Sequence, residues 1–166
     1  MFNYFAQTRT ILLSFLAFFA LFMAFRWVHA GIGDGPLLDT LFNGPDARER
    51  IAGMLPSEIL VHLIGTSTID MLYPFAYGIF FSGLLYRLGG GGAWRVRLAF
   101  LPLIGAGFDL LENLIQISAL AGGPDILGFK LALTGPKFVF ALLSIIFSFV
   151  LVMSAAVRYF QSYLKS

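Results

Sequence analysis

Cysteine is absent from this chain of 166 residues, and charged residues make up only 12% of it. Without cysteine the chain holds no disulfide-bonded secreted module, no zinc–thiolate or iron–sulfur site and no thiol nucleophile. A soluble domain carries about 25% charged residues, whereas this chain is 58% hydrophobic with a mean hydropathy of +0.85. The composition therefore predicts an integral membrane protein, and the length predicts one domain over residues 1–166.

The sequence also lacks the usual signatures of cofactor and nucleic-acid sites. Its eleven lysines and arginines are scattered, with no basic stripe interleaved with aromatics, so we expect no nucleic-acid partner. The glycines at 89–92 follow no predicted strand, so they do not indicate a nucleotide loop. A di-iron site would need two Glu-x-x-His motifs, which are missing. We expect no cofactor and no metal.

Four apolar stretches are long enough to cross a hydrocarbon core, which takes about 20 helical residues. They cover about residues 11–28, 68–86, 98–120 and 138–157. Because backbone groups in lipid must be satisfied within the segment, we expect an all-α bundle of four transmembrane helices. Val28-His29-Ala30 resembles a signal-peptide cleavage site. The preceding apolar core is long for a signal peptide, so a retained helix is expected.

Basic residues indicate the orientation of the helices. Six of them fall at the two ends of the chain and around the loop between the second and third spans, without an acidic residue: Arg9, Arg87, Arg95, Arg97, Arg158 and Lys165. The opposite side holds both signs: the acids Asp34, Asp39, Asp46, Glu49, Glu58 and Asp125, the bases Arg48, Arg50 and Lys130, and, at its boundary, Arg26 and Lys137. Both termini are therefore predicted to be cytoplasmic, in the inner membrane of a bacterial cell.

The outward loop over residues 31–56 is long and contains turn signals. Asp46 is a candidate N-cap for a short helix ending near Met54. This helix is predicted to lie on the membrane surface, anchored by Leu41, Phe42, Ile51 and Met54. Ser57 is a candidate cap for the second membrane helix. Counted from Ser57, that helix is too long to cross straight and is expected to tilt, protrude or break near Gly65.

Three carboxylates, Asp70, Asp109 and Glu112, fall inside the predicted spans. Each costs about 2.5–3.5 kcal/mol at a helix centre unless it is neutralised, paired or hydrated. They are the candidate acid–base or cation-binding groups, because a carboxyl in an apolar pocket can hold a proton near neutral pH.

Helical spacing places these carboxylates on polar faces. Shared faces are predicted for Gly105, Asp109, Glu112, Asn113 and Gln116; for Thr66, Asp70, Tyr73 and Tyr77; for Lys137, Ala141, Ser144, Ser148 and Ala155; and for Phe15, Phe19, Phe22 and Arg26. Pro74 cannot donate to the carbonyl of Asp70, so a kink and a free carbonyl are expected there.

The depths of these residues favour one polar pocket in the outer half of the bundle, opening outward. Its predicted ligand-binding residues are Tyr73, Tyr77, Asn113, Gln116, Lys137 and Arg26. Lys137 would supply the counter-charge to the carboxylates or bind an anionic headgroup. His29 and His62 are interpreted as structural residues.

Two classes of function remain open. In the first, the pocket binds a lipophilic small molecule or a lipid and converts it by acid–base chemistry or only retains it. In the second, the polar residues tie the helices together, and the protein is an accessory subunit of a larger membrane complex. Membrane lipids are expected partners in both, and either a homo-oligomer or a larger complex would fit. An ion path is disfavoured because the inner halves of the spans lack ionisable groups.

The motifs Asp70-Met71-Leu72-Tyr73-Pro74-Phe75-Ala76-Tyr77 and Phe108-Asp109-Leu110-Leu111-Glu112-Asn113 resemble a widespread, functionally uncharacterised family of small four-helix bacterial membrane proteins. Leu38-Asp39 and Lys137 fit the same resemblance, which covers most of the chain and implies topology rather than an activity. In architecture and acid placement alone, the chain is also similar to sterol-isomerase-like four-helix membrane proteins.

Overall fold

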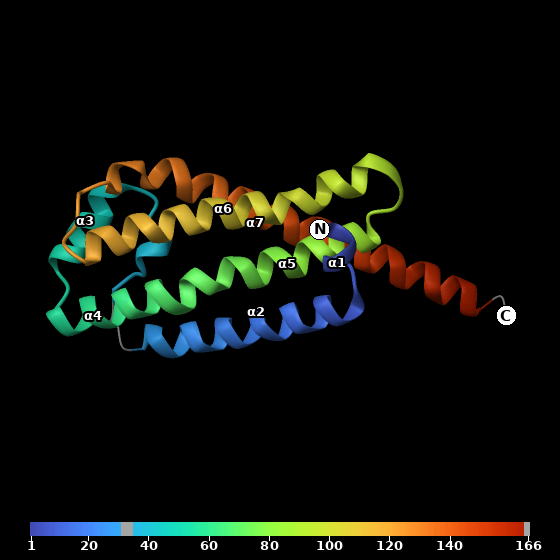
Figure 1. The fold of residues 1–166 in the computed structure, drawn as a ribbon, viewed down its shortest axis with the longest axis horizontal. Helices are drawn as coiled ribbons and strands as arrows, with labels where there is room; N and C mark the ends of the chain where they lie inside the picture. Colours follow the sequence, from blue (N-terminus) through green and yellow to red (C-terminus); the bar gives the residue numbers. More distant parts are fainter. Residues whose placement is uncertain (31–34, 165–166) are drawn as a thin grey trace.

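The computed structural model describes residues 1–30 and 35–164, without the side chains of Trp27 and His29. This part of the chain is helical and contains no strand, as the sequence predicts (Figure 1). Its helices are α1 (Phe2–Phe5), α2 (Thr8–His29), η1 (Leu38–Thr40), α3 (Gly44–Ala52), α4 (Pro56–Gly65), η2 (Thr66–Asp70), α5 (Met71–Leu88), α6 (Gly92–Leu120), η3 (Leu127–Phe129) and α7 (Lys130–Tyr163).

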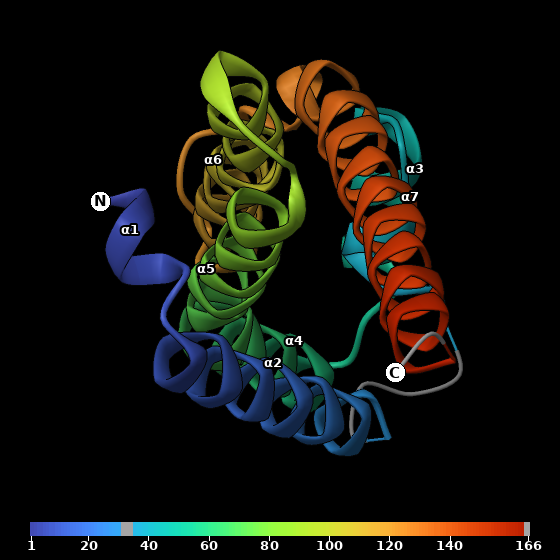
Figure 2. The ribbon, with the colours of Figure 1, turned by 90° about the vertical axis from the view of Figure 1, so that its right-hand side faces the viewer.

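Four segments are long and apolar enough to cross a membrane: Thr8–Arg26, Pro56–Leu88, Gly92–Leu120 and Leu127–Tyr163. Helix α5 packs between α2 and α6, and α7 packs on α6 and α5. Seen from the end, α2 and α7 stand apart on either side of the α5–α6 pair (Figure 2). Both chain ends and the α5–α6 link lie at one end of the bundle, opposite η1, α3 and α4 (Figure 1).

The second candidate membrane-spanning segment, Pro56–Leu88, is not a regular α-helix next to Gly65, one of the places where the sequence analysis allowed a break. Residues Thr66–Asp70 (η2) form a π-helical segment between α4 and α5. Pro74 lies inside α5 and lacks the N–H that would bond the Asp70 carbonyl. That carbonyl instead accepts a hydrogen bond of 2.9 Å from Nδ2 of Asn113 on α6. Local irregularity of the backbone is thus stabilised by a neighbouring helix at the level of the Asp70 carboxylate.

The end of the bundle opposite the chain termini is covered by η1 and α3. Leu38, Ala47 and Met54 are buried there in an apolar cluster with the ends of α6 and η3. A short helix is present here as predicted, but α3 ends at Ala52, and Met54 just beyond it is buried in this cluster. Partly buried Leu41 and Ile51 pack on the same cluster, whereas Phe42 is 47% exposed and stacks on Phe138.

The two capping residues predicted from the sequence, Asp46 and Ser57, are both wrong. Asn43, not Asp46, caps α3: its Oδ1 accepts the backbone N–H of Asp46 at 2.9 Å. Helix α4 begins at Pro56, so Ser57 already lies in its first turn. There the carboxylate of Glu58 accepts the N–H of Leu55 at 2.9 Å. In each case the helix has a proline in its first turn and starts earlier than the predicted cap implies, by three residues in α3 and by two in α4.

Candidate functional site

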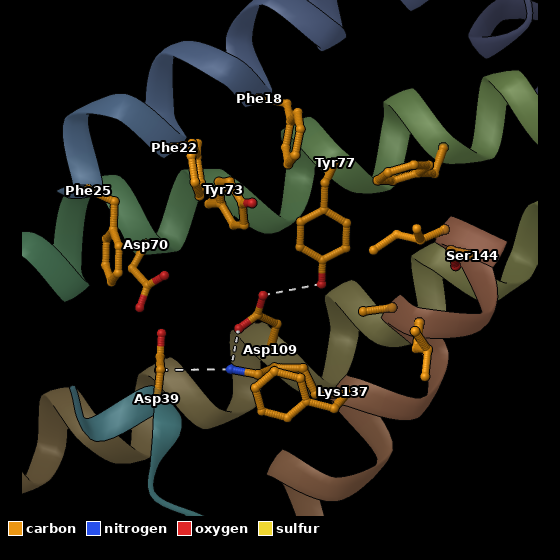
Figure 3. A pocket seen from close by; sticks show the side chains of 15 residues that line it. Phe18, Phe22, Phe25, Asp39, Asp70, Tyr73, Tyr77, Asp109, Lys137 and Ser144 are labelled. Atoms are coloured by element: carbon orange, nitrogen blue, oxygen red, sulfur yellow. Dashed lines mark hydrogen bonds and ion pairs between the residues drawn. The ribbon is translucent and has the colours of Figure 1, made fainter. Parts of the chain in front are cut away.

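A cavity of about 440 Å³ lies between α2 and α7, with residues of η2, α5 and α6 forming its floor. This volume is within the range of pockets that hold drug-sized ligands. Seven aromatic rings line it: Phe18, Phe22, Phe25, Tyr73, Tyr77, Phe81 and Phe138. Its charged lining consists of Asp39, Asp70, Asp109 and Lys137, which lie together at one end (Figure 3).

Lys137 is at the centre of the charged end. Its Nζ lies 3.2 Å from Oδ1 of Asp109 and 3.8 Å from Oδ1 of Asp39. Behind the cavity wall, the same ammonium lies 2.7 Å from Oε2 of Glu112. The other oxygen of Asp109 accepts a hydrogen bond of 3.2 Å from the hydroxyl of Tyr77. One lysine therefore joins carboxylates from η1 and α6 to α7.

Glu112 lies behind the cavity in a fully buried ion pair. Both it and Lys130, at the start of α7, have no exposed surface. Lys130 Nζ donates to Oε1 of Glu112, and the hydroxyl of Thr134 donates to the same oxygen at 2.7 Å. Glu112 was a candidate acid–base residue from the sequence, but the cavity lining does not include it. Its contacts connect α6 to the first turns of α7.

Asp39 reaches the site from η1, outside the membrane helices. Its Oδ1 accepts a hydrogen bond of 2.6 Å from Nε2 of Gln116. Burial raises the pKa of the Asp39 carboxyl, but the ammonium of Lys137 and the hydrogen bond from Gln116 outweigh burial, so its pKa lies below the ordinary value. A depressed folded-state pKa stabilises the fold above the unfolded pKa, and this contribution is lost as the pH falls through the folded pKa.

Asp70 differs from the other carboxylates of the site. It is 5% exposed, and its carboxylate points toward that of Asp39 (Figure 3). No basic side chain among the described residues forms an ion pair with it. The hydrogen bond from Asn113 goes to its backbone carbonyl and not to its carboxylate.

Of the residues predicted from the sequence, Asp70, Asp109, Tyr73, Tyr77 and Lys137 line the cavity. The lining does not include two other predicted ligand-binding residues, Asn113 and Gln116, which are fully buried and bond Asp70 and Asp39 instead. The remaining one, Arg26, is exposed and is not part of the lining.

The first helix turns a different face to the cavity than the sequence analysis expected. Phe18, Phe22 and Phe25 face it and are spaced by four and three residues. Arg26 follows Phe25 and therefore lies about 100° from it around the helix. Phe15 and Phe19 are 42% and 52% exposed. Between Arg9 and Arg26 this helix has no charged residue, so it offered no charged signal for its inward face.

Sequence reasoning missed Asp39 and Lys130 as site residues. Both were assigned to the outward loops because their charge lies outside the apolar runs. A signal for Lys130 was present, since Lys130, Thr134 and Lys137 are spaced by four and three residues and share one helix face. For Asp39 the only indication was that Leu38-Asp39 belongs to the family resemblance. Its position depends on the packing of Leu38 in the apolar cluster with Ala47 and Met54.

The hydrogen bond between Asn113 and the Asp70 carbonyl leads to a testable coupling. Asn113→Ala should lower the free energy of unfolding by about 1–3 kcal/mol, the cost of a buried unsatisfied acceptor. In a Pro74→Ala background the loss should shrink, because the restored N–H can reach the carbonyl. A double-mutant cycle by SDS titration measures this coupling. Equal losses in the two backgrounds would contradict the assignment of Asn113 as a substitute for the missing N–H.

These features define a helical protein with four helices able to span a membrane and an aromatic-lined cavity that holds charged side chains at one end. Comparison with protein-family models, with curated proteins and with solved structures found no match.

Proposed function

We propose that this protein is a multi-pass protein of the cytoplasmic membrane that binds a lipophilic small molecule or lipid in the cavity between α2 and α7. The observation that carries the proposal is the cavity itself. It has a volume of about 440 Å³, a mostly apolar and aromatic wall, and a few polar groups gathered at one end. Ligand sites combine these same features, since apolar walls supply binding energy and the polar groups fix orientation.

The exposed part of the lining suggests how a ligand enters. Phe22 on α2 and Phe138, Leu142 and Ile145 on α7 line the cavity and are 43–57% exposed. These side chains lie on the two helices that stand apart in Figure 2. In a bilayer they would face acyl chains, so a lipophilic molecule could pass sideways between α2 and α7. The sequence analysis had favoured an opening toward the outer face.

The proposed orientation has both termini in the cytoplasm. Arg9, Arg87, Arg95 and Arg97 are near the end of the bundle that holds the N-terminus and the α5–α6 link (Figure 1). Helices α3 and α4, at the opposite end, hold Asp46, Glu49 and Glu58 together with Arg48 and Arg50. This charge asymmetry is the pattern that places basic segments on the cytoplasmic side.

A bound molecule would lie beside carboxyl groups able to exchange protons. Asp70 and Asp109 are on the cavity wall, and Tyr77 bonds one oxygen of Asp109. A carboxyl and a phenol at hydrogen-bond distance from a substrate are suitable general acid–base groups. Acid–base conversion is therefore chemically available at this site, whereas retention of the molecule is the activity that the cavity directly supports.

Filling the cavity tests the proposal. Ala141 lines it on α7, and Ala141→Phe should reduce specific binding of radiolabelled dodecanol and dodecyltrimethylammonium at least about tenfold, since a large side chain takes the space of the ligand. Binding is measured on the protein in phosphatidylcholine nanodiscs after subtraction of empty nanodiscs. Ala156→Phe, on the same helix outside the lining, is the matched control. Unchanged binding of both probes by Ala141→Phe would refute the proposed function.

A further inference from the structure

The charges at the cavity do not balance within the protein. Four carboxylates, of Asp39, Asp70, Asp109 and Glu112, lie near two ammonium groups. Lys130 is bonded to Glu112 behind the wall. Every ion-pair contact of Lys137 is to a carboxylate, so its ammonium is already engaged. If all four acids are ionised, the site carries two unmatched negative charges.

The unmatched charge lies at the cavity surface and not behind it. Asp70 is only 5% exposed, and it has no basic partner among the described side chains. Its carboxylate points into the cavity beside that of Asp39 (Figure 3). A buried ionised carboxylate is costly without a partner. A proton shared between the two acids removes that cost, and so would a positive group placed between them.

The surrounding side chains suit a cation joined to an apolar body. The rings of Phe22, Phe25 and Tyr73 lie around Asp70 in Figure 3, and aromatic faces attract ammonium groups. Away from the acids the lining becomes aliphatic, with Leu142 and Ile145 on the α7 side. These two residues are also exposed on the proposed route from the bilayer.

We propose that the ligand is a lipophilic cation whose amine or quaternary ammonium group lies between Asp39 and Asp70. Its apolar part extends along Phe18, Leu142 and Ile145 toward the opening between α2 and α7. This inference rests on the proposed function and adds the charge of the ligand to it. Anionic headgroups, which Lys137 could in principle have bound, are disfavoured because carboxylates surround that ammonium.

Three probes with the same alkyl chain and different head charges test the inference: dodecyltrimethylammonium, dodecanol and dodecanoate. Specific binding is measured in phosphatidylcholine nanodiscs with empty nanodiscs subtracted. The native chain should bind the cation at least about tenfold more tightly than the alcohol, as expected for a charge-assisted contact, and the anion most weakly. Asp70→Asn should remove most of the preference for the cation while changing dodecanol binding less than about twofold.

Glu49→Gln is the matched control, because it removes one negative charge from an exposed position on α3 and should leave the preference intact. Asp39→Asn provides a second variant if Asp70→Asn folds poorly, and it should also weaken cation binding selectively. Equal binding of cation and alcohol by the native chain, or an unchanged preference in both variants, would overturn the inference. If Ala141→Phe still blocks dodecanol binding in that case, the proposed function survives and only the ligand charge is wrong.

Discussion

Replacing Glu112 by glutamine is expected to destabilise the bundle rather than only to change what it binds. The substitution removes the carboxylate that neutralises Lys130, and Lys130 has no exposed surface through which water could solvate its ammonium. It also weakens the acceptor for Thr134. Breaking a buried pair by removing one partner costs about 3–5 kcal/mol. We expect a loss of this size in the free energy of unfolding measured by SDS titration, and a low yield of monodisperse protein.

Removing both charges separates this effect from a general intolerance of the position. The Glu112→Gln, Lys130→Met double variant removes one negative and one positive charge together and creates no new unmatched buried charge, so most of the lost stability should return. Asp125→Asn is the control: its partner Arg48 is 2.6 Å away, but both side chains are about half exposed, and a solvated pair contributes little. Normal folding of Glu112→Gln together with loss of probe binding would instead place Glu112 in the binding site.

The helix positions and much of the polar face could be predicted from the sequence because both depend on local periodicity. Spacing by three and four residues correctly grouped Asp109 and Glu112 on the buried face of α6, and Asp70 and Tyr77 on one face of η2 and α5. The free carbonyl of Asp70 could also be predicted from the sequence, because it depends only on Pro74 four residues later. A proline without an N–H requires another donor for the Asp70 carbonyl, and Asn113 supplies it.

The sequence could not show that Glu112 lies behind the cavity while Asp39, Asp70 and Asp109 line it, because this arrangement depends on contacts between distant segments. Hydropathy predicted that the last span begins only after Lys137, whereas α7 begins at Lys130 because Glu112 neutralises that lysine inside the bundle. This pairing takes Glu112 out of the cavity. Asp39 reaches the site because η1 (Leu38–Thr40) packs on the end of the bundle, where Leu38 is buried. No periodic pattern in the loop encodes that position.

Replacing Lys137 by methionine is expected to give a protein that is less stable at neutral pH and loses less of its stability on acidification than the native chain. Lys137 lies 2.7 Å from Glu112, 3.2 Å from Asp109 and 3.8 Å from Asp39. Without its ammonium, Asp39 and Asp109 have no cation within ion-pair distance among the described residues, and we expect a loss of about 3–5 kcal/mol at neutral pH.

The sign of the pH dependence follows from Asp39. In the native chain, the charge of Lys137 helps to hold the pKa of Asp39 below its ordinary value, so acidification removes a stabilising contribution. In Lys137→Met that cause is absent and burial still raises the pKa of Asp39, while the hydrogen bond from Gln116 still lowers it, so acidification should remove less stability than it does in the native chain.

SDS titrations between about pH 3 and pH 6, a range that includes the ordinary pKa of an aspartate carboxyl, compare the two slopes directly. Adding Asp109→Asn to Lys137→Met should recover part of the stability at neutral pH, because it removes one of the stranded charges. The interpretation would be contradicted if native and Lys137→Met proteins lost stability in parallel on acidification. Parallel curves would mean that Lys137 acts through packing of its aliphatic stem and not by neutralising the carboxylates from η1 and α6.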